Sequence, residues 1–241
     1  MAEHSDRYQY PVDYFTDQGF IVYAMDLRGH GRSDGRQSYA ASLEVFLEDI
    51  RLFLQKVRKE MPHRRIFLIG HSFGGQLVLN YGAHFPDSLG GIIVSSPNIR
   101  LRLKIPLWKR LMAPVLSTLL PTLTVGNTLD PRSVSRNPEV VEAYRRDSKI
   151  RRKITLRLAD VMLGNQLNIL DVARRLHLPT FLMHAGDDQI CSPEGTREFF
   201  EKVPASDKSL KIYDGFYHEL FNEIERETVF KDMERWIRER I

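Results

Sequence analysis

The sequence contains little cysteine and no long hydrophobic run. Cys191 is the single cysteine among 241 residues, which excludes an intrachain disulfide framework and a cysteine-rich metal site. The apolar runs fall well short of the ~20 residues that a transmembrane helix needs. The first 20 residues are polar and lack the apolar core of a signal peptide, which predicts a cytoplasmic protein or one that associates peripherally with a membrane.

Acidic residues are scarce in the middle of the chain. Residues 97–165 hold 14 Lys and Arg against 5 Asp and Glu, whereas the remainder holds 21 against 26. This basic segment could contact an anionic lipid surface or form a solvated basic face. We expect no binding to nucleic acid, because the remainder is acidic and no nucleic-acid-binding pattern is present.

Short β-branched and aliphatic runs alternate with helical patterns along the rest of the chain. The predicted strands are Phe20–Met25, Ile66–Ile69, Gly91–Val94, Thr180–His184 and Ser209–Tyr213. The predicted helices cover residues 43–57, 76–85, 194–202 and 229–237. This alternation predicts the α/β class, with a parallel sheet flanked by helices and ligands bound beyond the carboxyl ends of the strands.

The alternation lapses between about Ser96 and Leu178, where the sequence has a helical and basic character. We therefore predict a core made of residues 1–96 and 179–241, and a helical cap insertion made of residues 97–178. An apolar stripe over residues 107–120 indicates a cap helix, which Pro114 should kink. This stripe could pack onto the body over a site or serve as a lid at a lipid interface.

The predicted strand Ile66–Ile69 leads into Gly70-His71-Ser72-Phe73-Gly74-Gly75 and then into a helix. A serine on such a sharp turn needs small neighbours, because the strand and the helix crowd it. The G-x-S-x-G pattern in this context predicts that Ser72 is a nucleophile. His71 beside it is expected to be a packing neighbour.

A serine hydroxyl needs a base, and the base needs a carboxylate that fixes its tautomer. His218 follows the last predicted strand and is the candidate base. Asp187 and Asp188 both follow the strand Thr180–His184, and either could supply the carboxylate. The resulting order Ser, Asp, His is the order found in α/β-hydrolases.

Four segments and a cap motif carry a closer resemblance. They are EHSDRY at 3–8, DLRGHGRSDG at 26–35, GHSFGG at 70–75, KIYDGFYH at 211–218 and SVSRN at 133–137. With these the chain resembles the monoacylglycerol lipase and lysophospholipase family of α/β-hydrolases over nearly its whole length. The resemblance implies an α/β-hydrolase fold with a helical cap, and it places the catalytic acid at Asp188.

The resemblance also implies the mechanism. Ser72 attacks an ester carbonyl, His218 transfers the proton, Asp188 orients His218, and water hydrolyses the acyl-enzyme. Two backbone N–H groups should hold the oxyanion, namely those of Phe73 and, by alignment, Met1. The family carries a His-Gly dipeptide and a central strand before the segment that matches residues 2–4, and neither is present here. We therefore expect either that the strands beside this position close up or that the chain is a truncated form.

The expected substrates are monoacylglycerols or lysophospholipids, with no cofactor and no metal site. Glu3 and Arg7 match the family's polar stretch near the nucleophile and could bind a glycerol-like head. The acyl chain is expected against Leu107, Leu111, Met112 and Leu116. The alternatives are a general carboxylesterase or aminopeptidase-like hydrolase, and a non-catalytic lipid-binding or interaction module.

Overall fold

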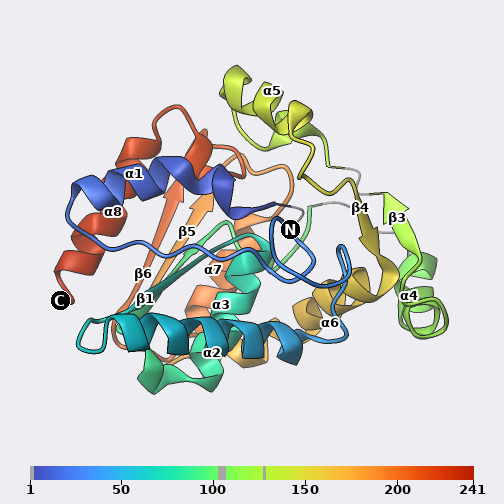
Figure 1. Cartoon of the computed structure of the whole chain (residues 1–241), viewed down its shortest axis with the longest axis horizontal. Coiled ribbons are helices and arrows are strands. Elements are labelled where there is room, and N and C mark those ends of the chain that lie inside the picture. The colour runs from blue at the N-terminus through green and yellow to red at the C-terminus, as the bar shows by residue number, and fades with distance from the viewer. Residues whose placement is uncertain (1–2, 103–106, 127–128) are drawn as a thin grey trace.

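The computed structural model describes residues 3–102, 107–126 and 129–241. Its main sheet has four parallel strands in the order β1-β2-β5-β6 (Figure 1). These strands are β1 (Phe67–His71), β2 (Gly91–Ser95), β5 (Thr180–Ala185) and β6 (Lys208–Tyr213). The structure thus confirms four of the five predicted strands.

Helices cover both faces of this sheet. On one face lie α1 (Gln9–Asp17) and α8 (Arg226–Arg238), and on the other lie α3 (Phe73–His84) and α7 (Pro193–Lys202). Helix α2 (Leu43–Glu60) packs outside α3 (Figure 1). Successive strand residues point to opposite faces, so Ile93 packs toward α8 while Ile92 and Val94 pack toward α3. Both faces are therefore apolar, which explains why the strands read as continuous hydrophobic runs.

The prediction of a fifth strand at Phe20–Met25 is wrong. This segment runs extended from α1, but no ladder joins it to β1 in the described part of the chain. Phe20 packs into the core beside α1 and Met25 into the core beside α2, while Ile21 between them is 57% exposed. The composition favours a strand, yet a strand forms only where a neighbour pairs with its N–H and C=O groups. The expected closing up of the two neighbouring strands is therefore not seen.

Within its described residues, the segment between β2 and β5 adds no strand to the main sheet. It contains α4 (Leu107–Leu119), the 3-10 helix η3 (Pro131–Ser133), α5 (Pro138–Arg146) and α6 (Leu156–Ala173). It also contains a small antiparallel ribbon of β3 (Thr124–Gly126) and β4 (Lys153–Thr155), which the helical prediction missed. Strands of three residues are too short to show a period in sequence.

The carboxyl-terminal half of α6 packs into the core of the body, where Ile169, Val172 and Ala173 are buried against α3 and α7. The division at residues 96/97 and 178/179 stays a prediction.

The carboxyl ends of β1, β5 and β6 meet at one edge of the sheet. Ser72 follows β1, Asp188 lies three residues after β5, and His218 lies five residues after β6. The 3-10 helix η4 (Leu220–Asn222) begins two residues after His218. A parallel sheet thus gathers three segments that are far apart in sequence.

Candidate active site

Ser72 occupies the sharp turn between β1 and α3. Its backbone has φ 54° and ψ −117°, a conformation that residues other than glycine rarely adopt. A Cβ atom on Gly70 would lie 2.4 Å from the carbonyl oxygen of Gly74, and one on Gly75 would lie 2.8 Å from the Cγ1 of Val94. These glycines therefore let the helix cross close to the strand and hold the serine in its strained conformation.

His218 and Asp188 are joined by a hydrogen bond of 2.7 Å from Nδ1 to Oδ2. The other carboxylate oxygen of Asp188 accepts the backbone N–H groups of Ile190 at 2.8 Å and Cys191 at 2.9 Å. Burial alone would raise the pKa of Asp188, but His218 and His184 hold that pKa well below its usual range. The carboxylate is thus an ionised partner that keeps the Nε2 of His218 free for a proton.

Asp187, the other candidate acid, points elsewhere. Its side chain is exposed and its backbone N–H donates to the carbonyl of Phe216 at 3.0 Å. The structure therefore brings Asp188, and not Asp187, to His218.

Ser72 and His218 line the same cavity of about 210 Å³. No hydrogen bond joins their described side chains, a separation that is common in the absence of substrate. His71 packs against the base, with its ring centroid 4.7 Å from that of His218. Burial and the nearby His218 lower the pKa of His71 to about 3, so His71 is a neutral neighbour at physiological pH.

Phe73 is the first residue of α3, so its N–H has no acceptor within the helix. It directly follows Ser72, and its side chain is buried in an edge contact with Phe46. The backbone N–H of Phe73 therefore lies next to Ser72 without a helical acceptor, and its role as an oxyanion donor stays a prediction. Met1, the other predicted donor, lies outside the described residues.

A cluster of buried charges borders the same cavity. Arg7 donates from Nη1 and Nη2 to the two carboxylate oxygens of Glu219, at 3.0 and 2.8 Å, and also to Glu3. Tyr8 donates to the second oxygen of Glu3 at 2.9 Å, and Arg7 lies over the ring of Tyr144, 4.7 Å from its centroid. Glu3 and Glu219 line the cavity together with Ser72 and His218.

The two carboxylates of this cluster share one cation and titrate differently. Burial and the neighbouring Glu3 raise the pKa of Glu219 to about 7. Although burial opposes it, Arg7 holds the pKa of Glu3 well below its usual range. Glu3 and Arg7 are among the residues predicted from the sequence and Glu219 is not, although its place directly after His218 was a signal in the sequence.

Most of the other residues that line the cavity are apolar. They are Leu101, Leu129, Val134, Ile154, Ala159, Met162, Leu163, Ile190 and Cys191, whereas Asn98 and Tyr144 add polar groups. Met112 and Leu116 of the predicted acyl-binding set are not among the lining residues, and the side chains of Leu107 and Leu111 lie outside the described part of the structure. A role for these four residues in binding an acyl chain stays a prediction.

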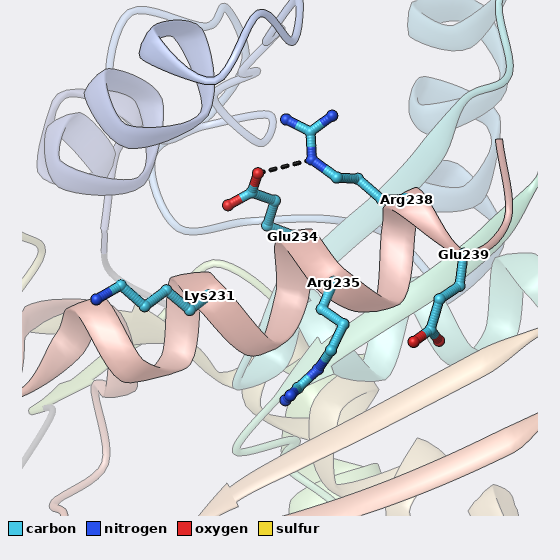
Figure 2. A pocket seen from close by; sticks show the side chains of 5 residues that line it. All are labelled: Lys231, Glu234, Arg235, Arg238 and Glu239. Atoms are coloured by element: carbon cyan, nitrogen blue, oxygen red, sulfur yellow. Dashed lines mark hydrogen bonds and ion pairs between the residues drawn. The ribbon is translucent and has the colours of Figure 1, made fainter.

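A second and wider hollow lies on the surface of α8, far from these residues. Figure 2 shows that it is lined by charged side chains of one helix, with an ion pair of 2.7 Å between Glu234 and Arg238. No serine, cysteine or histidine lines it. Its chemistry is that of a solvated charged helix face, so the smaller cavity is the candidate site.

The structure also brings three possible metal ligands together. Donor atoms of Asp188, Cys191 and His218 lie within 4.8 Å of one another. Both carboxylate oxygens already accept hydrogen bonds, and burial raises the pKa of the Cys191 thiol, which keeps it protonated. A thiol binds metals as the thiolate, so this set fits a hydrogen-bonded triad better than a metal centre.

The chain is similar to known hydrolases over its full length. The family model described as "Serine aminopeptidase, S33" matches residues 1–225. A monoacylglycerol lipase of Mycolicibacterium smegmatis is 35% identical over 98% of this chain and 84% of its own length. An abhydrolase domain-containing protein of Dictyostelium discoideum is 38% identical, but this chain spans only 26% of that relative. The crystal structure of Paleococcus ferrophilus monoacylglycerol lipase superposes with a TM-score of 0.90 at 32% identity and covers 98% of this chain and 90% of its own.

Proposed function

The chain belongs to the serine aminopeptidase S33 family of α/β-hydrolases, and we propose that it is a serine hydrolase that cleaves monoacylglycerols to a fatty acid and glycerol. The observation that carries this proposal is the cavity itself. Ser72, His218 and two carboxylates line it, and most of its other lining side chains are apolar. An ester with a polyol head and an acyl chain matches both kinds of side chain.

The proposed reaction follows from the positions of the side chains. The hydroxyl of Ser72 attacks the ester carbonyl and passes its proton to Nε2 of His218, which then protonates the leaving glycerol oxygen. The backbone N–H of Phe73 stabilises the oxyanion. Water, deprotonated by His218, then attacks the acyl-enzyme and releases the fatty acid. Asp188 holds the Nδ1 proton of His218 throughout.

The charge of the lining residues favours a neutral head over a phosphate. Glu3 and Glu219 line the cavity, whereas none of the described lining residues is Lys or Arg. Arg7 lies behind the two carboxylates and already donates to both. A phosphodiester in this cavity would meet carboxylates without a free cation, which supports monoacylglycerols over lysophospholipids as the substrate class.

A substrate panel measured against pH tests this proposal. We expect kcat/KM for a monooleoylglycerol to exceed that for an oleoyl lysophosphatidylglycerol at every pH. The ratio should grow about 10-fold between pH 6 and pH 8.5, because a pKa of about 7 leaves Glu219 mostly neutral at pH 6 and mostly anionic at pH 8.5. Any pH dependence of the catalytic step that both substrates share cancels in the ratio, and the phosphodiester keeps its charge across the range.

Two variants and one further substrate complete the panel. Glu219→Gln should flatten the pH dependence of the ratio, whereas Glu225→Gln at an exposed position should not. A ratio that falls with pH, or a preference for the lysophospholipid, would refute the assignment of the head group. Faster cleavage of an aminoacyl amide than of any ester would favour the aminopeptidase alternative.

We further propose that the cap contacts a membrane surface from which the substrate enters. Within the described residues, no helix has the length and apolarity needed to cross a bilayer. Large apolar side chains nevertheless lie exposed on α4, on β3 and on the turn that joins them, which are neighbours in Figure 1. They are Met112, Val115, Leu119, Leu120, Leu123 and Val125. Lys153 on β4 is exposed and pairs with β3, so positive charge lies beside this apolar surface.

Vesicles of phosphatidylcholine and phosphatidylglycerol test the membrane contact. Leu123→Glu should weaken vesicle binding about 10-fold, because it loses the transfer of one large aliphatic side chain and adds an anionic charge. Leu52 on α2 has the same exposed fraction of 51% as Leu123 and provides the control Leu52→Glu. Equal binding by the two variants in a sedimentation assay would contradict a contact through the cap.

A further inference from the structure

The loop that carries His218 is fastened on both sides of this residue. The backbone N–H of Tyr217, directly before it, donates to the Oε1 of Glu223 at 2.9 Å. The backbone N–H of Glu219, directly after it, donates at 2.8 Å to the carbonyl of Val134, which belongs to the segment between η3 and α5. One of the two hydrogen-bond acceptors therefore belongs to the loop itself and the other to the cap.

Glu223 also connects the loop to the cap. Its side chain is fully buried, and its two oxygens accept the backbone N–H of Arg136 at 3.0 Å and the Nε of Arg136 at 2.9 Å. The guanidinium of Arg136 further pairs with Glu225 and lies over the ring of Phe216, 5.0 Å from its centroid. One buried carboxylate thus serves both the residue before His218 and an arginine of the cap.

Two further hydrogen bonds join the cap to the loop of His218. The hydroxyl of Ser135 donates to the carbonyl of Asn222 at 2.9 Å, and the side chain of Asn222 donates to Glu219 at 2.8 Å. A buried carboxylate that loses its cationic partner is costly to keep ionised. Removing Arg136 should therefore change the protonation or the place of Glu223, and the amide of Tyr217 would lose its acceptor.

We propose that Arg136 is a positioning residue for His218, acting through Glu223, and that this couples the position of the cap to the geometry of the base. The proposal rests on the proposed hydrolase function only in taking His218 as the base. Residues 134–136 and Glu223 form what we call the cap clamp. If the cap moves while these hydrogen bonds persist, the loop of His218 moves with it. A displacement of the cap should therefore change proton transfer by His218 more than it changes substrate binding.

Kinetics of clamp variants test the proposal with a short-chain ester. Arg136→Gln should lower kcat about 30-fold and leave KM within about three-fold, because a small misplacement of the base affects the transition state and not the ground state. Arg136→Lys keeps a cation beside Glu223 and should recover most of the loss. Arg132→Gln is the matched control, since Arg132 lies four residues earlier, is 75% exposed and pairs with the nearby Asp130.

A double variant separates positioning from stability. Arg136→Met with Glu223→Leu removes both charges and should restore the melting temperature that Arg136→Gln lowers. It still lacks the acceptor for the Tyr217 amide, so its kcat should stay low. The downfield proton resonance of His218 Nδ1–H should shift in both variants and not in Arg132→Gln.

Two results would overturn the proposal. The first is a normal kcat and an unshifted His218 resonance in Arg136→Gln. The second is a double variant that regains kcat together with its stability, which would leave the clamp a structural role alone. A wild-type protein without activity on monoacylglycerols would refute the proposed function instead, and the His218 resonance would still test the clamp.

Discussion

Asp188→Asn is expected to lower kcat for ester hydrolysis about 10⁴-fold. The carboxamide can still accept the backbone N–H groups of Ile190 and Cys191 through its oxygen. Its NH₂ group would then face Nδ1 of His218, from which the carboxylate oxygen now accepts a hydrogen bond of 2.7 Å. The ring would have to carry its proton on Nε2, so it could no longer act as a base toward Ser72. Steady-state kinetics with a chromogenic ester measure this loss.

Asp187→Asn is the matched control, because it makes the same change one residue earlier on an exposed side chain. We expect its kcat to stay within about two-fold of the wild type, as is usual for a surface substitution. If Asp187→Asn lost more activity than Asp188→Asn, the assignment of the acid would be wrong. Circular dichroism of both variants checks that each loss is chemical and not a failure to fold.

Ser72→Ala is expected to abolish labelling by a fluorophosphonate probe and to lower kcat/KM at least about 10⁴-fold. The probe reacts covalently with an activated serine, so the loss reports the nucleophile and not the cavity. Alanine and serine both carry a Cβ atom, so the substitution adds no backbone strain at this turn, where φ is 54°. The variant should therefore fold as well as the wild type and still bind substrate.

Ser96→Ala gives a stringent comparison for this result. Ser96 directly follows β2, is buried and also has a positive φ, of 40°, but it does not line the cavity. Its substitution should leave labelling unchanged. A wild-type protein that folds and is not labelled would support the non-catalytic alternative, and labelling that persists in Ser72→Ala would move the nucleophile to another residue.

Residues of the candidate site differ in how far the sequence could predict them. Ser72 and His218 each lie a few residues after a predicted strand, so the rule that parallel strands end at one edge places them together. Asp188 could not be separated from Asp187 by that rule, because both follow the same strand. The separation comes from burial, since only Asp188 turns inward to His218.

Ion pairs between residues far apart in the chain could not be predicted from the sequence pattern. Glu219 and Arg7 are 212 residues apart, and Arg136 and Glu223 are 87 apart, so no local period links them. The same limit explains the error at Phe20–Met25, where composition favours a strand but pairing decides it.

By itself, the sequence determined the α/β class, four strands of the sheet, the strained turn around Ser72 and the basic character of residues 97–165. These features follow from local spacing, glycine placement and charge, which are properties of neighbouring residues. The tertiary structure places Asp188, the acid that the resemblance indicates, at His218. It alone decided that Glu3 and Glu219 share Arg7 and that residues 134–136 are hydrogen-bonded to the segment around His218. Those outcomes depend on which distant groups become buried together, because a buried charge is costly unless it is paired and only the fold sets which groups are close enough to pair.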